Sequence, residues 1–215
     1  MTPEEIRANL SCPVASVRLL FDKEGNRDYT RDQLVVGGVL DKEQIYLIVN
    51  HWPSRSGGQA RSAPHRKAAA LLTKRILDSL RQQADDARII IMGDFNDNPT
   101  DHSIKNILNS WGEQDSVYDP RLFNPMELPF KKGEGSLAYR DSWSLFDQFL
   151  LSPAFCLGES KKFSYLRAGV FRPLFLLTPK GKYRGYPFRT FASGVYQGGY
   201  SDHFPVYLQI VKNEN

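Results

Sequence analysis

The chain has 215 residues, of which 41% are hydrophobic and 24% are charged. This length and apolar content are typical of one compact domain, so we expect a monomer with a single domain over residues 1–215 and its core at about 30–211. No apolar run approaches the roughly 18 residues of a membrane span, and residues 1–10 lack the apolar core of a signal peptide, so neither is expected.

The charge balance is mildly basic, with 28 Lys and Arg against 24 Asp and Glu, a net charge of +4 and a pI of about 9.0. It permits an anionic partner without requiring one. The two cysteines, Cys12 and Cys156, have neither metal-ligand spacing nor the pattern of a disulfide framework. We therefore expect two free thiols, and the cellular location is left open.

The first predicted elements are β-rich runs at 33–40 and 44–50, which indicate a hairpin that ends at Asn50. Apolar residues then recur at helical spacing from Pro64 to about residue 84, which predicts one amphipathic helix with a basic, solvated face. The helix's apolar positions are Ala68, Leu71, Leu72, Ile76, Leu77 and Leu80, and its basic positions are Lys67, Lys74, Arg75 and Arg81.

Residues 88–92 are too uniformly apolar for a strand with one wet face, so we expect a central strand of a sheet. Thr100 or Asp101 can cap a following helix at 102–111. Residues 111–140 have weak periodicity and predict a long surface excursion. Strands are expected at 144–152, with Asp147 buried in the middle, and at 205–211, which gives a layered α/β domain.

The turn that follows strand 88–92 concentrates acceptor groups, with Asp94, Asn96 and Asp97 within four residues. Gly93 allows a close approach of the backbone, and Asp94 and Asn96 share a face in an extended turn. A carboxylate beside an amide suits a hard cation or a phosphate. The alternative is an Asx turn that only closes a loop.

Three further segments bring polar groups next to apolar strands, at 49–55, 145–152 and 200–206. His51 alone is more often a structural residue. Asp147 inside an apolar strand needs a partner, because an unpaired buried carboxylate costs several kcal/mol by order of magnitude. Adjacent Asp202 and His203 point to opposite faces of an extended segment, so one could ligate a metal while the other meets Asp147.

The order His, Gly-Asp-Phe-Asn, strand Asp and Ser-Asp-His resembles the endonuclease/exonuclease/phosphatase superfamily, which includes deoxyribonuclease I, neutral sphingomyelinases and inositol polyphosphate 5-phosphatases. Residues 50–58 and 185–191 are most similar to a bacterial branch. The resemblance implies an α/β fold, a two-sheet β-sandwich flanked by helices. It also implies hydrolysis of phosphate esters with Mg²⁺ or Mn²⁺.

The resemblance implies a role for each motif residue. His203 would be the general base that takes a proton from water, with Asp147 holding its imidazole, and Asp94 would orient the water. Asp202 and Asp94 would be the metal ligands.

Three residues would contact the phosphate. By resemblance, Asn96 would bind a non-bridging oxygen and His51 would stabilise charge on the phosphoryl group. Arg55 is added from its chemistry, because a guanidinium matches phosphate bidentately. An exposed solubilising arginine is an equal alternative at this position.

The sequence departs from the family pattern in its first third, where members supply a strand Asn and a Gln-Glu motif that carries the main metal ligand. Residues 1–32 contain neither, and Glu4 and Glu5 do not resemble that motif. The sequence therefore looks like a family member that lacks about its first hundred residues. A truncated, non-catalytic remnant is the alternative to an enzyme.

The substrate is expected to be a phosphate ester, and a nuclease is the leading interpretation because basic residues cluster around the motifs. These residues are Arg61, Arg66, Lys67, Arg184 and Arg189. A generic basic surface explains them equally well. The runner-up is a sphingomyelinase-like or phosphoinositide-phosphatase-like hydrolase of lipid headgroups, since residues 171–177 and 183–191 interleave aromatics with arginines.

Overall fold

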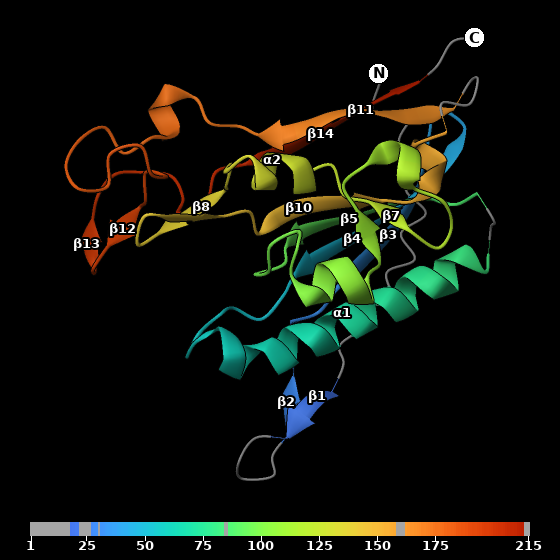
Figure 1. Cartoon of the computed structure of the whole chain (residues 1–215), viewed down its shortest axis with the longest axis horizontal. Helices are drawn as coiled ribbons and strands as arrows, with labels where there is room; N and C mark the ends of the chain where they lie inside the picture. Colours follow the sequence, from blue (N-terminus) through green and yellow to red (C-terminus); the bar gives the residue numbers. More distant parts are fainter. Residues whose placement is uncertain (1–17, 22–26, 30, 84–85, 158–161, 213–215) are drawn as a thin grey trace.

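The computed structural model describes residues 18–21, 27–29, 31–83, 86–157 and 162–212 (Figure 1). The helical elements are α1 (Gln59–Arg81), π-helix η2 (Ser103–Ile107), 3₁₀-helix η3 (Gln114–Ser116), α2 (Glu127–Lys131), η4 (Pro153–Phe155) and η5 (Leu174–Leu176). The strands are β1 (Arg18–Phe21), β2 (Arg27–Tyr29), β3 (Leu34–Leu40), β4 (Glu43–His51), β5 (Arg88–Asp94), β6 (Ser110–Trp111), β7 (Leu122–Phe123), β8 (Leu137–Tyr139), β9 (Ser142–Ser144), β10 (Asp147–Leu151), β11 (Phe163–Val170), β12 (Phe191–Ala192), β13 (Val195–Tyr196) and β14 (Val206–Lys212).

The main sheet has six strands in the order β3-β4-β5-β10-β7-β6. β3 and β4 form the predicted antiparallel hairpin, and α1 carries the chain from β4 to β5, which pairs with β4 in parallel. β10 then pairs antiparallel to the other side of β5. The uniformly apolar β5 is therefore central, as predicted, because both of its edges are paired and both of its faces are covered.

The core lies in two layers, one on each face of the main sheet. Ile89 and Ile91 of β5 pack in a cluster with α1, whereas Ile90 packs in a second cluster with β11 and β14, which form their own two-stranded sheet. Figure 1 shows α1 along one side of the main sheet and β11–β14 along the other. This arrangement confirms the predicted two-sheet sandwich with a flanking helix.

Helix α1 begins five residues earlier than predicted, at Gln59. Pro64 lies inside its second turn, where the missing N–H removes one helical hydrogen bond without ending the helix. The buried face also differs from the prediction. Leu71 is exposed, whereas Arg66 is buried, because Arg66 has a buried carboxylate as its partner.

The prediction of a surface excursion at 111–140 is wrong. β7 pairs with β10 and β6 pairs with β7, so this segment extends the main sheet, and Leu122, Phe123 and Met126 are buried. The strands that extend the sheet here, β6 and β7, are only two residues long, which is too short to produce a periodic pattern. Asp147 is also not in the middle of its strand but at the first position of β10.

The predicted helix at 102–111 shrinks to the five-residue η2, which has no side-chain cap. Asp101 instead accepts hydrogen bonds from the Asn98 N–H and from Arg55. Its carboxylate therefore closes the preceding loop, which is the alternative use of an aspartate before a helix.

In the described part of the chain, no helix combines the length and apolar character that crossing a membrane requires. Cys156 is a free, half-buried thiol, and burial together with the charge of Asp115 raises its pKa to about 12. Cys12 lies outside the described residues.

Candidate active site

Three of the predicted site residues lie in one row across neighbouring strands. His51 at the end of β4 is in register with Asp94 at the end of β5, and Asp94 is in register with Asp147 at the start of β10. Side chains of directly paired residues project from the same face of a sheet. The strand pairing therefore places one imidazole and two carboxylates side by side.

Gly93 precedes Asp94 and permits this row to form. Its φ of +134° lies in the region that favours glycine, and a Cβ built at this position would be 1.9 Å from the backbone oxygen of Asn50. The close approach that the sequence indicated is thus an approach to the neighbouring strand β4. No other residue could hold β5 at this distance from β4.

The Asp94 carboxylate is held by the turn that follows it. The Asn96 N–H donates to Asp94 Oδ1 at 2.9 Å, and Asn96 Nδ2 lies 3.3 Å from Oδ2, while Nδ2 also donates to the Trp52 carbonyl at 2.9 Å. His51 Nε2 lies 3.4 Å from Asp94 Oδ2. The turn is therefore an Asx turn, and the same bonds fix Asp94 and Asn96 beside His51.

The second carboxylate orients a histidine. His203 Nδ1 lies 2.7 Å from Asp147 Oδ2, and Ser136 Oγ donates to the same oxygen at 2.5 Å. His203 lies in the loop before β14, so this contact ties that loop to β10. The arrangement leaves Nε2 of the imidazole for another partner.

Burial and nearby charges shift the pKa values of Asp94 and His203. Burial raises the pKa of Asp94, opposed by the Asn96 N–H and reinforced by the nearby charge of Asp147. For His203, burial lowers the pKa, but the hydrogen bond and charge of Asp147 and the charges of Asp94 and Asp202 outweigh it, so the net shift is upward. Perturbed groups of this kind gather at functional sites.

Asp94, Asp147 and His203 can also face one cation, because one ligand atom from each lies within 4.8 Å of the others. Two neighbouring carboxylates form an oxygen donor set of the kind that suits Mg²⁺ or Mn²⁺. Asp202, predicted as a metal ligand with Asp94, is exposed and lies outside this cluster. The described residues therefore fit a divalent ion through Asp94 and Asp147.

Arg55 is bound by the loop that carries Asn96. Its Nε donates to the Asn96 carbonyl at 2.8 Å, and its terminal nitrogens contact Gln59, Asp97 and Asp101. The guanidinium, predicted as a phosphate clamp, thus has partners within the chain. We assign it to positioning the loop of Asn96.

Asp97 is the hub of this support. It accepts from the buried Arg66 Nε at 2.6 Å and from Ser103 Oγ at 2.6 Å. The sequence suggested Arg66 as part of a basic surface. Its side chain is instead 1% exposed and is bound to Asp97. The site is consequently anchored to α1 and η2 as well as to the sheet.

Sequence reasoning missed Ser136 and Gln148. Gln148 is buried on β10 and donates to the carbonyl of Asp97 at 2.6 Å. An amide in an apolar strand could have indicated a supporting residue of the site, because a buried amide must find hydrogen-bond partners. Ser136 lies in the segment wrongly predicted as a surface excursion, and no local pattern indicates its contact with Asp147.

Two packed sheets, a helix on the outer face and a carboxylate–histidine cluster at a row of strand ends define the deoxyribonuclease I-like class of α/β sandwich. The family model described as the endonuclease/exonuclease/phosphatase family matches residues 9–212. The chain belongs to this family, which confirms the resemblance drawn from the motifs. No curated protein sequence matches the chain.

Solved structures of low sequence identity share the fold. D. rerio TDP2, solved with a single-stranded DNA product, is 13% identical with a TM-score of 0.55, covering 97% of this chain and 70% of that chain. An endonuclease/exonuclease/phosphatase family protein from Bacteroides thetaiotaomicron is 16% identical with a TM-score of 0.51, covering 98% and 67%. A mannosyl-6-phosphatase from the same organism is 16% identical with a TM-score of 0.50, covering 97% and 68%.

Proposed function

We propose that the chain is a divalent-metal-dependent phosphoesterase, specifically a phosphodiesterase that cleaves nucleic acid with water activated by His203. The observation that carries the proposal is the 2.7 Å contact between His203 Nδ1 and Asp147 Oδ2, with Asp94 in the same cluster. A histidine oriented by a carboxylate is a common device for drawing a proton from water near neutral pH.

In this proposal Asp147 accepts from the Nδ1–H of His203 and so selects the tautomer whose Nε2 can take the proton. Ser136 donates to the same oxygen of Asp147 and so helps to hold the carboxylate. Asp94 orients the attacking water. His51, whose side chain is 55% exposed, stabilises the charge that develops on the phosphoryl oxygens.

Asn96 is proposed to contact the substrate phosphate. Its backbone N–H holds Asp94, and Nδ2 donates to the Trp52 carbonyl at 2.9 Å, so its position is fixed before substrate arrives; the other hydrogen of Nδ2, 3.3 Å from Asp94 Oδ2 in the free chain, would donate to the phosphate. Such preorganisation is what electrostatic stabilisation of a transition state requires.

Asp94 and Asp147 would hold the divalent ion, with Asp202 as a candidate outer ligand. When bound, Mg²⁺ or Mn²⁺ supplies neutralisation of negative charge on the phosphate. Two protein carboxylates are few for a tight site, so we expect weak Mg²⁺ binding that Asp94→Asn abolishes. Titration calorimetry tests this without any assay of activity, and unchanged affinity in Asp94→Asn would remove Asp94 from the site.

The proposal is tested with plasmid DNA and bis-p-nitrophenyl phosphate, each with Mg²⁺ or Mn²⁺ and with chelator. His203→Ala should lower kcat about 10²- to 10⁴-fold and change KM little, because it removes proton abstraction and leaves the phosphate contacts. His102→Ala, a change at an exposed histidine outside the site, is the matched control. Full activity in His203→Ala, or activity indifferent to chelator, would reject this mechanism.

A second candidate, hydrolysis of lipid headgroups, is favoured by one observation. Leu174, Phe175 and Phe191 are 86%, 59% and 59% exposed, in the segments where aromatics alternate with arginines. Exposed aromatics beside cations suit a membrane interface. Sedimentation with anionic lipid vesicles separates the candidates, because only the second predicts binding that is lost in Leu174→Ser/Phe175→Ser.

A further inference from the structure

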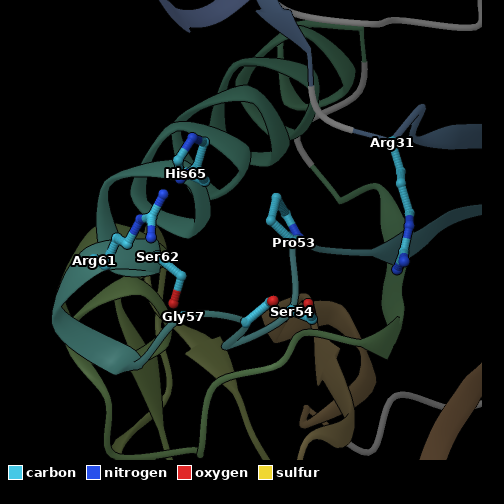
Figure 2. A pocket seen from close by; sticks show the side chains of 8 residues that line it. Arg31, Pro53, Ser54, Gly57, Arg61, Ser62 and His65 are labelled. Atoms are coloured by element: carbon cyan, nitrogen blue, oxygen red, sulfur yellow. The ribbon is translucent and has the colours of Figure 1, made fainter. Parts of the chain in front are cut away.

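A basic pocket opens beside the candidate active site. It has a volume of about 460 Å³ and is lined by Arg31, Pro53, Ser54, Ser56, Gly57, Arg61, Ser62 and His65. Figure 2 shows Arg61 and His65 on α1 at one side and Arg31 at the other, with Pro53 and Ser54 between them. Its lining includes no acidic residue, so the pocket suits an anion.

The two arginines of this pocket differ from the other arginines nearby. Arg55 and Arg66 are both bound to Asp97. Across the residues that the structure describes, neither Arg31 nor Arg61 forms an ion pair, and the first turn of α1 carries no acidic residue. Their charge is thus available to a ligand.

The local backbone adds donors to the same place. α1 is 23 residues long and begins after Gly58 without a side-chain cap, so its first N–H groups lack side-chain acceptors. Gly57 has a φ of +74°, and a Cβ there would lie 3.2 Å from Cδ of Arg61. The stem of Arg61 therefore lies across Gly57, which keeps the guanidinium at the helix start.

The pocket is close in sequence to the row of His51, Asp94 and Asp147. Ser54 is three residues beyond His51, and three residues span at most about 10 Å. Phosphates along a nucleic-acid strand recur about every 3.4 Å of helix axis, so the wall of the pocket at Ser54 lies within about three nucleotides of a phosphate at His51.

Resting on the proposed function, we propose that this pocket is a second phosphate subsite, in which Arg31 and Arg61 bind a backbone phosphate one to three nucleotides from the scissile one. The preferred substrate is then a polynucleotide strand. An inositol phosphate headgroup also carries several phosphates, but an open pocket beside a continuous loop fits a strand that passes through it.

The experiment compares the wild-type protein, the double variant Arg31→Gln/Arg61→Gln and the control Arg75→Gln. Arg75 is an exposed arginine of the same helix, about 21 Å along its axis from Arg61. Binding of labelled single strands with one or four phosphates is measured by fluorescence anisotropy in chelator, over a range of salt concentrations.

Lengthening the strand from one phosphate to four should improve the affinity of the wild-type protein, and this gain should be roughly 10-fold smaller in the double variant. The slope of log K against log salt should fall by about 1.4, the value for two lost contacts with a single strand. Arg75→Gln should match the wild type in both measurements.

Equal gain and slope in the double variant and the wild type would overturn the subsite, as would failure of the wild-type protein to bind the longer strand. A soluble inositol bisphosphate that binds more tightly than the four-phosphate strand, with loss of that binding in the double variant, would overturn the assignment to nucleic acid. Wild-type protein that binds strands but hydrolyses neither plasmid nor bis-p-nitrophenyl phosphate would instead reject the proposed function alone.

Discussion

The protonation of His203 decides when the proposed base can act. Asp147, Asp94 and Asp202 together raise its pKa despite burial, so the imidazole stays protonated to a higher pH than an isolated histidine. A protonated imidazole accepts no proton. The acid limb of the pH–rate profile should therefore lie above the ordinary histidine range.

Asp147→Asn tests this origin of the acid limb. Loss of the Asp147 charge lowers the pKa of His203, so the acid limb of kcat should move to lower pH while the maximum rate falls. The measurement is kcat against pH with bis-p-nitrophenyl phosphate. Ser136→Ala is the control, because it removes a neighbour of Asp147 and keeps the charge. A limb that stays in place in Asp147→Asn would show that His203 is not the titrating group.

The raised pKa of Asp94 has a consequence for stability. The pKa is raised mainly by burial, so the folded state holds the proton more tightly than the unfolded state does. Stability is then lost as the pH rises through the interval between the ordinary carboxyl pKa and the raised one, and the penalty is complete above it.

Asp94→Asn should therefore stabilise the protein at pH 7 in the presence of chelator while it abolishes activity. The amide keeps an oxygen for the Asn96 N–H and removes the repulsion with Asp147. We expect a rise in Tm of roughly 2–4 °C, the effect of about 1 kcal/mol in a domain of this size, which vanishes below the ordinary carboxyl pKa. Calorimetric scans at pH 7 and pH 3 measure it, and an unchanged or lower Tm at pH 7 would contradict it.

The sequence indicated His51 and Asp94 because each comes at the end of an apolar strand, and parallel neighbouring strands deliver their last side chains to a shared edge. Asp147 was indicated by a different signal, a carboxylate among apolar residues that needs a partner, and its position at the start of β10 was not predicted. The location of Asp202 and the partners of Arg55 could not be predicted, because both depend on how loops distant in the sequence meet.

Among the elements, α1 is attached to the site through one buried ion pair. Arg66→Ala leaves Asp97 buried with only Arg55 and Ser103 as partners, and breaking such a pair costs about 3–5 kcal/mol. Chemical denaturation should show a loss near the lower value, because Arg55 remains. Lys67→Ala, the exposed neighbour on α1, should change the free energy of unfolding by less than about 0.5 kcal/mol. Equal effects of the two changes would exclude the ion pair as an anchor.

Element prediction succeeded where pattern and burial agree. The apolar runs of β4 and β5 and the spacing in α1 each reflect a face that is buried along its length. β6 and β7 have two residues each, and they exist only because β10 lies beside β7 and β7 lies beside β6. Their pairing is a tertiary effect, which a single window of sequence does not contain.

For the molecule as a whole, the rate at which Cys156 is labelled measures how often the two sheets separate. Cys156 packs against the cluster between the main sheet and β11–β14, and its pKa of about 12 leaves little thiolate at pH 8. In a Cys12→Ser background, labelling by a thiol reagent should be slow and should accelerate with denaturant in step with unfolding. Fast labelling of the native protein, at the rate of a free peptide thiol, would refute this description.

The alignment of His51, Asp94 and Asp147 across three strands would make the proposed hydrolysis a measure of strand register. A slip of β10 by one residue would turn Asp147 to the opposite face, away from Asp94 and His203, while most backbone hydrogen bonds could re-form. Such a slipped conformer would have almost the same circular dichroism as the native protein and no catalytic row. The turnover number would thus distinguish preparations with the correct register of β10 from slipped ones, even where their circular dichroism spectra are the same.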